Sequence, residues 1–175
     1  METMTMTATA TKSSDFVISR VFDVSREMLW KCFTEPERMK QWWGPKGFTV
    51  MVSKMDLRPG GTYLYGMRSP DGQDMWGRMV YREIVPPERL VFVNSFSDEK
   101  GGLTRHPMAP QWPIEMLSIF TFEELPDGKT KFTVRWSPLN PTPEEQKAFD
   151  EGHGSMNMGW SGTLEQLGAY VAKLA

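Results

Sequence analysis

The sequence predicts a single α+β domain in which a curved antiparallel sheet of seven strands wraps around a long C-terminal helix. Between Ser155 and Leu174, the large apolar residues recur at helical spacing and fall within an arc of about 80°. The middle of the chain instead alternates with a period of two between tight-turn sequences, which is typical of hairpin-linked strands. A chain of 175 residues can bury a core of this kind without disulfides or metal ions.

The first 14 residues are rich in Thr, Met and Ala, and lack a basic start and a continuous apolar block. We therefore expect a disordered segment at 1–14, not a secretory signal, and a folded domain over 15–175. No run approaches the roughly 20 apolar residues of a membrane span, so we expect no membrane insertion. The single cysteine, Cys32, favours a cytoplasmic location and an inert buried thiol.

The charges are nearly balanced, with 20 basic and 22 acidic residues and a formal net charge of -2. This balance argues against a protein that binds nucleic acid by neutralising phosphates, and no basic cluster suggests a lipid-binding patch. We expect no nucleic-acid partner.

The N-terminal elements follow from local signals. Residues 16–24 are β-rich and of strand length. Ser25 then precedes a short amphipathic helix, in the position of an N-cap. Pro36 ends that helix and fits the first turn of a second short helix, which stops at Gly44-Pro45.

Beyond these helices, turn sequences containing Pro, Asp and Gly separate six further strands, which predicts an antiparallel meander. The expected strands are 47–57, 62–69, 74–85, 89–96, 115–125 and 129–138.

The connection from Ser97 to Pro113 has 17 residues and little periodicity. Such long loops are uncommon in compact domains and are often functional or mobile. It carries His106, Met108 and Trp112. Two interpretations remain open: an ordinary surface loop held by its prolines, or a lid at the mouth of a cavity.

An ordered set of motifs resembles the START-like (SRPBCC) superfamily, and within it the branch homologous to the C-terminal domain of the activator of heat-shock protein 90 ATPase. The resemblance covers about residues 15–174. Its motifs are Trp42-Trp43-Gly44-Pro45, Asp56 to Gly61, Pro70-Asp71-Gly72, Glu83 to Leu90, His106-Pro107, Trp112-Pro113, Phe120 to Glu124, Gly128 to Thr130, His153 to Met156 and Gly159-Trp160.

This resemblance implies a helix-grip fold with a cavity between the sheet and the long helix. Members bind lipids, sterols, polyketides or other apolar small molecules, and some are cyclases or aromatases. We therefore expect a protein that binds a small hydrophobic or aromatic ligand. A polyketide-cyclase-like or hydrolytic enzyme using the same cavity is one alternative, and a chaperone-associated interaction protein is another. A homodimer formed through a strand edge or a helix flank is also compatible with the sequence.

The cavity would be lined by one face of each strand, the inner side of the long helix, the short helices and the long loop. For each candidate, the alternative is that the side chain simply fills the core. The candidates are Trp42, Trp43, Tyr63, Tyr65, Met67, Met79, Tyr81, Phe92, Phe96, Trp112, Trp136, Met156, Trp160 and Leu164.

The sequence contains no recognisable catalytic triad, metal-ligand spacing or phosphate-binding loop, so we expect no catalytic residue, metal or cofactor. The acid–base candidates are His106, His153, Glu115 and Arg78, each of which has an ordinary surface or salt-bridge interpretation.

The predicted long helix also contains Gly159, Gly162 and Gly168, each of which costs about 1 kcal/mol relative to Ala. Close approach of the helix to the sheet would explain them, and so would space left for a ligand.

Overall fold

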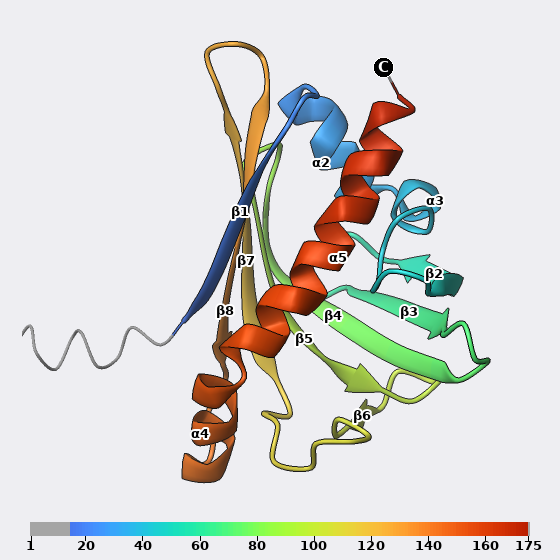
Figure 1. The fold of residues 1–175 in the computed structure, drawn as a ribbon, viewed down its shortest axis with the longest axis vertical. Helices are drawn as coiled ribbons and strands as arrows, with labels where there is room; N and C mark the ends of the chain where they lie inside the picture. The colour runs from blue at the N-terminus through green and yellow to red at the C-terminus, as the bar shows by residue number, and fades with distance from the viewer. Residues whose placement is uncertain (1–14, 175) are drawn as a thin grey trace, which may run out of the picture.

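The structure is a computed structural model that describes residues 15–174. An antiparallel sheet bends around one long helix, α5 (His153–Ala172), which crosses its concave face (Figure 1). The predicted α+β helix-grip architecture is therefore confirmed. The segment expected to be disordered, 1–14, lies outside the described residues.

The strands lie in the order β1-β8-β7-β5-β4-β3-β2, with β6 paired to β5, and every pairing is antiparallel. Strands β1 and β2 form the two edges of this sheet. The strands are β1 (Phe16–Phe22), β2 (Thr49–Met55), β3 (Thr62–Arg68), β4 (Asp74–Val85), β5 (Arg89–Ser97), β6 (Leu103–Thr104), β7 (Met116–Glu124) and β8 (Thr130–Pro138).

The prediction of seven strands was wrong by one, because β6 forms inside the long 97–113 connection. Its two residues pair with Phe96 and Ser97 of β5. The Asp98 carboxylate closes the turn between them by accepting hydrogen bonds from the Lys100 and Gly102 backbone N–H groups, both at 2.8 Å. Two residues are too few to produce a period-two signal, so pattern reading could not reveal this strand.

The two short helices after the first strand are present as predicted. Helix α2 (Arg26–Thr34) is capped by the Ser25 hydroxyl, which accepts a hydrogen bond from the Met28 N–H at 3.2 Å. Helix α3 (Pro36–Met39) starts with its proline. Cys32 is fully buried on α2, and this burial raises the pKa of its thiol to about 11.

A further helix, α4 (Pro143–Glu151), was not predicted, although local signals for it exist. The Thr142 hydroxyl and the Glu145 carboxylate form a capping box, and proline occupies the first turn. Helix α5 begins right after Gly152, two residues before the expected start.

Aromatic packing fills one end of the concave face. Phe33 of α2 is at the centre of this cluster, with ring centroids 4.7 Å from Phe132, 4.8 Å from Trp42 and 5.5 Å from Phe120. Figure 1 shows α2 beside the C-terminal half of α5. The packed aromatic core therefore lies under the C-terminal half of α5. The short helices do not cover the space under its N-terminal half.

Candidate functional site

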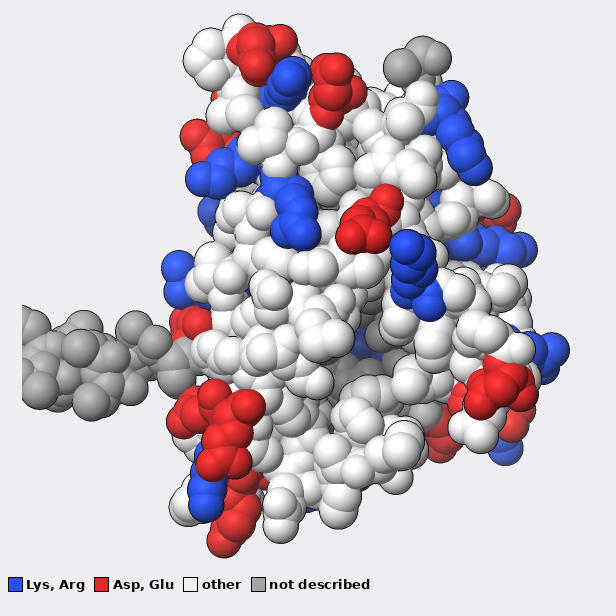
Figure 2. Space-filling model, viewed as in Figure 1, with Lys and Arg blue, Asp and Glu red and all other residues white. Residues whose placement is uncertain are grey.

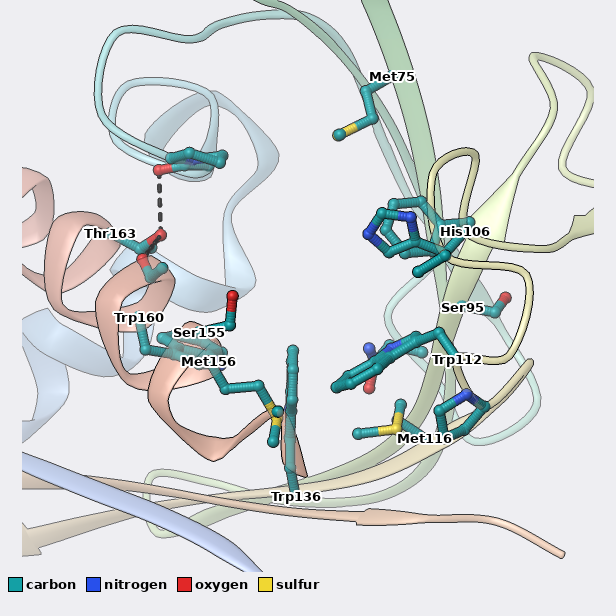
Figure 3. Close-up of a pocket in the computed structure, with 18 of the residues that line it drawn as sticks. Met75, Ser95, His106, Trp112, Met116, Trp136, Ser155, Met156, Trp160 and Thr163 are labelled. Carbon is teal, nitrogen blue, oxygen red and sulfur yellow. Dashed lines mark hydrogen bonds between the residues drawn. The ribbon is translucent and has the colours of Figure 1, made fainter. Parts of the chain in front are cut away.

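A cavity of ≈ 620 Å³ lies between the concave face of the sheet and the N-terminal half of α5. Its mouth is visible in Figure 2 as a hollow beside α5, surrounded mostly by uncharged residues. In Figure 3, Ser155, Met156 and Trp160 of α5 face His106 and Trp112 of the 97–113 connection across this space. Sheet, helix and long loop thus supply separate walls.

Most of the predicted ligand-contact residues are brought together here. Ten of the fourteen candidates line the cavity. They are Trp43, Tyr65, Met67, Met79, Phe92, Phe96, Trp112, Trp136, Met156 and Trp160.

Four candidates, Trp42, Tyr63, Tyr81 and Leu164, do not line the cavity and belong to the packed core. The Trp42 indole N–H donates to the Cys32 carbonyl oxygen at 3.1 Å. The Tyr63 hydroxyl is 2.7 Å from the Ser53 hydroxyl oxygen. Tyr81 and Leu164 are each only 2% exposed.

The strand residues among these four were assigned to the correct face. Tyr63 lies two residues before the cavity residue Tyr65, and Tyr81 two residues after Met79, so alternation places both pairs inside. They miss the cavity because they lie further along the strands, toward the end that the short helices close. Alternation along a strand identifies the residues on its inner face. It does not show where along that face the packed core ends and the cavity begins.

Several lining residues were missed. Asn94 lies between Phe92 and Phe96 on β5 and shares their parity, so alternation could have found it. Thr163 directly precedes the predicted stripe residue Leu164, and its small side chain hid it, whereas Gly159 had been noted only as a glycine that could leave space for a ligand. Met75, Ser95, Met116 and Phe120 complete the missed sheet positions.

The 97–113 connection forms one wall of the cavity through His106, Ala109, Trp112 and Pro113. The His106 ring lies 4.7 Å from the Phe96 ring, and its Nδ1 accepts the Met108 backbone N–H at 3.0 Å. Burial lowers the pKa of His106, which favours a neutral imidazole with its proton on Nε2.

An ion pair ties this connection to α4. Arg105 Nη1 lies 2.9 Å from Glu145 Oε2 and also donates to the Pro110 carbonyl oxygen at 3.1 Å. The Glu145 side chain is only 7% exposed. Its pKa is held below the usual range, first by the Thr142 backbone N–H and then by Arg105. The capping box of α4 therefore also anchors the loop.

Trp112 rests at the break between α4 and α5. Its ring centroid lies 6.0 Å from that of Phe149. A Cβ placed on Gly152 would come within 2.8 Å of the Trp112 ring, so a glycine is needed for this close contact.

The cavity is almost free of charge. Among the described residues that line it, there is no lysine or arginine, and Glu151 is the sole carboxylate. Burial raises the pKa of Tyr65 to about 12, opposed by the neighbouring Trp43 indole, so the phenol stays neutral. The Thr163 hydroxyl is engaged with the carbonyl oxygen of Gly44 at 3.1 Å (Figure 3).

Of the four acid–base candidates, only His106 faces the cavity. His153 sits between the rings of Phe16 and Phe149, at 5.8 and 5.2 Å. Arg78 donates to the Gly101 carbonyl oxygen at 2.8 Å, and Glu115 does not line the cavity.

Within residues 15–174, no cluster of three or more His, Cys, Asp or Glu side chains could hold a metal ion. No helix in that range combines the length and apolar character needed to cross a membrane.

Comparison with solved structures finds the same fold in bacterial proteins. A crystal structure of a protein from Mycobacterium smegmatis superposes with a TM-score of 0.71 at 23% identity, covering 93% of this chain and 91% of that one. The AHSA1 protein from Silicibacter pomeroyi gives a TM-score of 0.70 at 22% identity, with coverage of 92% and 99%. A solution structure from Arthrobacter aurescens gives 0.74 at 24%, with coverage of 93% and 88%.

A sheet bent around a long helix, with a cavity between them, defines a helix-grip protein. The family model described as "Activator of Hsp90 ATPase homolog 1-like protein" matches residues 23–172, and the chain belongs to this family. A comparison with curated proteins finds no match.

Proposed function

We propose that the protein binds a small hydrophobic or aromatic molecule in the cavity between the sheet and α5. The observation that carries this proposal is a cavity of ≈ 620 Å³ with eight aromatic lining residues. Ligand sites typically measure about 300–1,000 Å³ and combine apolar walls with a few polar groups. A chain that needed only a core would gain dispersion energy by filling this space.

The aromatic walls hold one another in place, which supports a preformed site. Trp160 is central, with ring centroids 5.8 Å from Trp43, 5.6 Å from Trp136 and 5.7 Å from Phe120. All three contacts are edge-to-face, a favoured geometry for aromatic pairs. Rings that are already ordered lose little entropy when a ligand enters, which favours affinity.

Thermal shift and tryptophan fluorescence test the proposal, with uncharged naphthalene derivatives as probes. A probe at 100 times its Kd stabilises a folded protein by about 2.7 kcal/mol, a rise in Tm of roughly 5–10 °C for a chain of this length. We also expect quenching of the tryptophans, since four of them line the cavity. A panel of such probes that changes neither signal would refute the proposal.

An enzyme acting in the same cavity is the second candidate, favoured by the single observation that a neutral imidazole, His106, faces the space. The His106 Nδ1 accepts a hydrogen bond from the Met108 backbone N–H, so the ring nitrogen is not paired with a nucleophile. Binding without turnover is therefore our preferred function. Conversion of a bound probe, abolished by His106→Phe, would reverse this preference.

A chaperone-associated role rests on the description of the family alone. Recovery of a chaperone with the intact protein, undiminished when the cavity is blocked, would favour that role over ligand binding.

A further inference from the structure

We propose that the ligand is an uncharged aromatic molecule with a carbonyl-type hydrogen-bond acceptor, which the Asn94 side-chain amide receives on the sheet side of the cavity. This inference rests on the proposed binding function and narrows its ligand class.

The amide of Asn94 is oriented by the protein. Asn94 lies on β5 opposite Met79 of β4 and Met116 of β7, and all three line the cavity. The fully buried hydroxyl of Ser118 donates a hydrogen bond to Asn94 Oδ1. The acceptor end of the amide is therefore occupied.

The donor end of the same amide has no protein partner within residues 15–174. Its Nδ2 carries two N–H groups, and Asn94 borders a space walled mainly by aromatic rings and methionines. A polar group facing apolar surroundings is costly unless it finds a partner. An oxygen acceptor on a ligand would satisfy it.

A second donor lies nearby. Asn94 and Phe96 are two residues apart on one face of β5, roughly 7 Å along the strand. The His106 ring packs on Phe96, and because Nδ1 accepts the Met108 N–H, Nε2 carries the proton. The Asn94 amide and the His106 ring at this wall therefore both offer donors, which suits ligand oxygens without hydrogens.

The charges of the lining residues disfavour an acidic ligand. A carboxylate in the cavity would lose its water without meeting a lysine or arginine among the described lining residues, and would lie near Glu151. A ligand ammonium would meet Glu151 only at the exposed rim, and would face N–H donors at Asn94. An uncharged ring system with one acceptor fits the aromatic walls and the donors together.

Four naphthalene probes that differ at one position test this inference on the full chain: 2-acetylnaphthalene, 2-ethylnaphthalene, 2-naphthoate and 2-naphthylmethylammonium. Fluorescence titration gives each Kd. One neutral hydrogen bond corresponds to about 2- to 13-fold in affinity, so we expect the acetyl probe to bind several-fold more tightly than the ethyl probe. The naphthoate should bind most weakly.

A double variant and a single variant test whether Asn94 causes the preference for the acetyl probe over the ethyl probe. In the double variant Asn94→Leu/Ser118→Ala, both partners of the internal hydrogen bond become apolar, so no buried hydroxyl is left unpaired. The ratio of acetyl to ethyl affinity should fall to about 1. The single variant Ser118→Ala keeps the amide donors and should retain a preference for the acetyl probe.

An infrared measurement on the wild-type protein tests the same hydrogen bond without relying on variants, which could fail to fold. The infrared carbonyl stretch of 2-acetylnaphthalene bound to the wild-type protein should shift to lower frequency than in an apolar solvent. An unshifted carbonyl, equal affinities of the acetyl and ethyl probes, or tightest binding of either charged probe would overturn the inference while leaving a binding cavity in place. Failure of all four probes to bind would instead count against the proposed function itself.

Discussion

Gly159 offers the sharpest test of whether the cavity is reserved for a ligand. It lies in the middle of α5 and lines the cavity, and a Cβ built there would have no heavy atom within 4 Å. Close helix–sheet approach therefore does not require this glycine. Gly159→Ala should stabilise the protein by about 0.5–1 kcal/mol, because alanine is the better helix former and no clash offsets the gain.

The expected gain corresponds to a rise in Tm of roughly 1–4 °C for a domain of this length. Gly159→Leu, in contrast, would place a branched side chain into the space a ligand uses. Overpacking of this kind costs about 1–3 kcal/mol, so the affinity for 2-ethylnaphthalene should fall by about 5- to 150-fold. Differential scanning calorimetry and fluorescence titration measure the two effects separately.

Gly168 provides the matched control. It lies in the same helix but outside the cavity, and a Cβ there would make an ordinary contact 3.7 Å from Phe22 Cε1. Gly168→Ala should raise stability by a similar amount and leave probe binding unchanged. Destabilisation by Gly159→Ala, or full probe affinity in Gly159→Leu, would refute the view that Gly159 keeps space open.

Three further substitutions test other parts of the site. Gly77→Ala should destabilise the protein by about 1–3 kcal/mol in urea titrations, because the new Cβ would lie 2.3 Å from the Tyr65 hydroxyl oxygen; unchanged stability would contradict this packing. Glu145→Gln should cost about 1 kcal/mol at neutral pH by weakening the α4 cap and the Arg105 pair. Since folding lowers the pKa of Glu145, the wild type should lose that advantage as the pH falls from 4.5 through the folded-state pKa, and the two unfolding curves should converge; parallel curves would argue against the shift. Folding also lowers the pKa of His106, so the unfolded state binds more protons and wild-type stability should fall as the pH drops below 6.5, a slope that His106→Phe should reduce.

The fold was largely predictable because its signals are local. The helical stripe ending at Leu174, the Ser25 cap and the hairpin turns each depend on neighbouring residues, and all reappear in the structure. The capping signals at Thr142 and Glu145 were equally local, so α4 was missed although its signals were present. Strand β6 is different, because its two residues become a strand only by pairing with β5.

The cavity was partly predictable for a related reason. Alternation along each strand identifies the inner face, so Tyr65, Met79 and Phe92 were placed correctly. How far the core fills that face depends on the position of α2, whose Phe33 packs against Trp42, Phe120 of β7 and Phe132 of β8. That contact excludes Trp42 from the cavity, and no local pattern encodes it.

The amino-acid sequence by itself determined the element types, the antiparallel order of most strands and the inward side of each, because periodicity and turn chemistry act over a few residues. Only the tertiary structure decided where the concave face is filled and where it stays hollow. It also brought Asn94, Gly159 and His106 around one space, from a strand, a helix and a loop. These placements depend on packing between segments far apart in the chain, where side-chain volume and helix position decide the outcome.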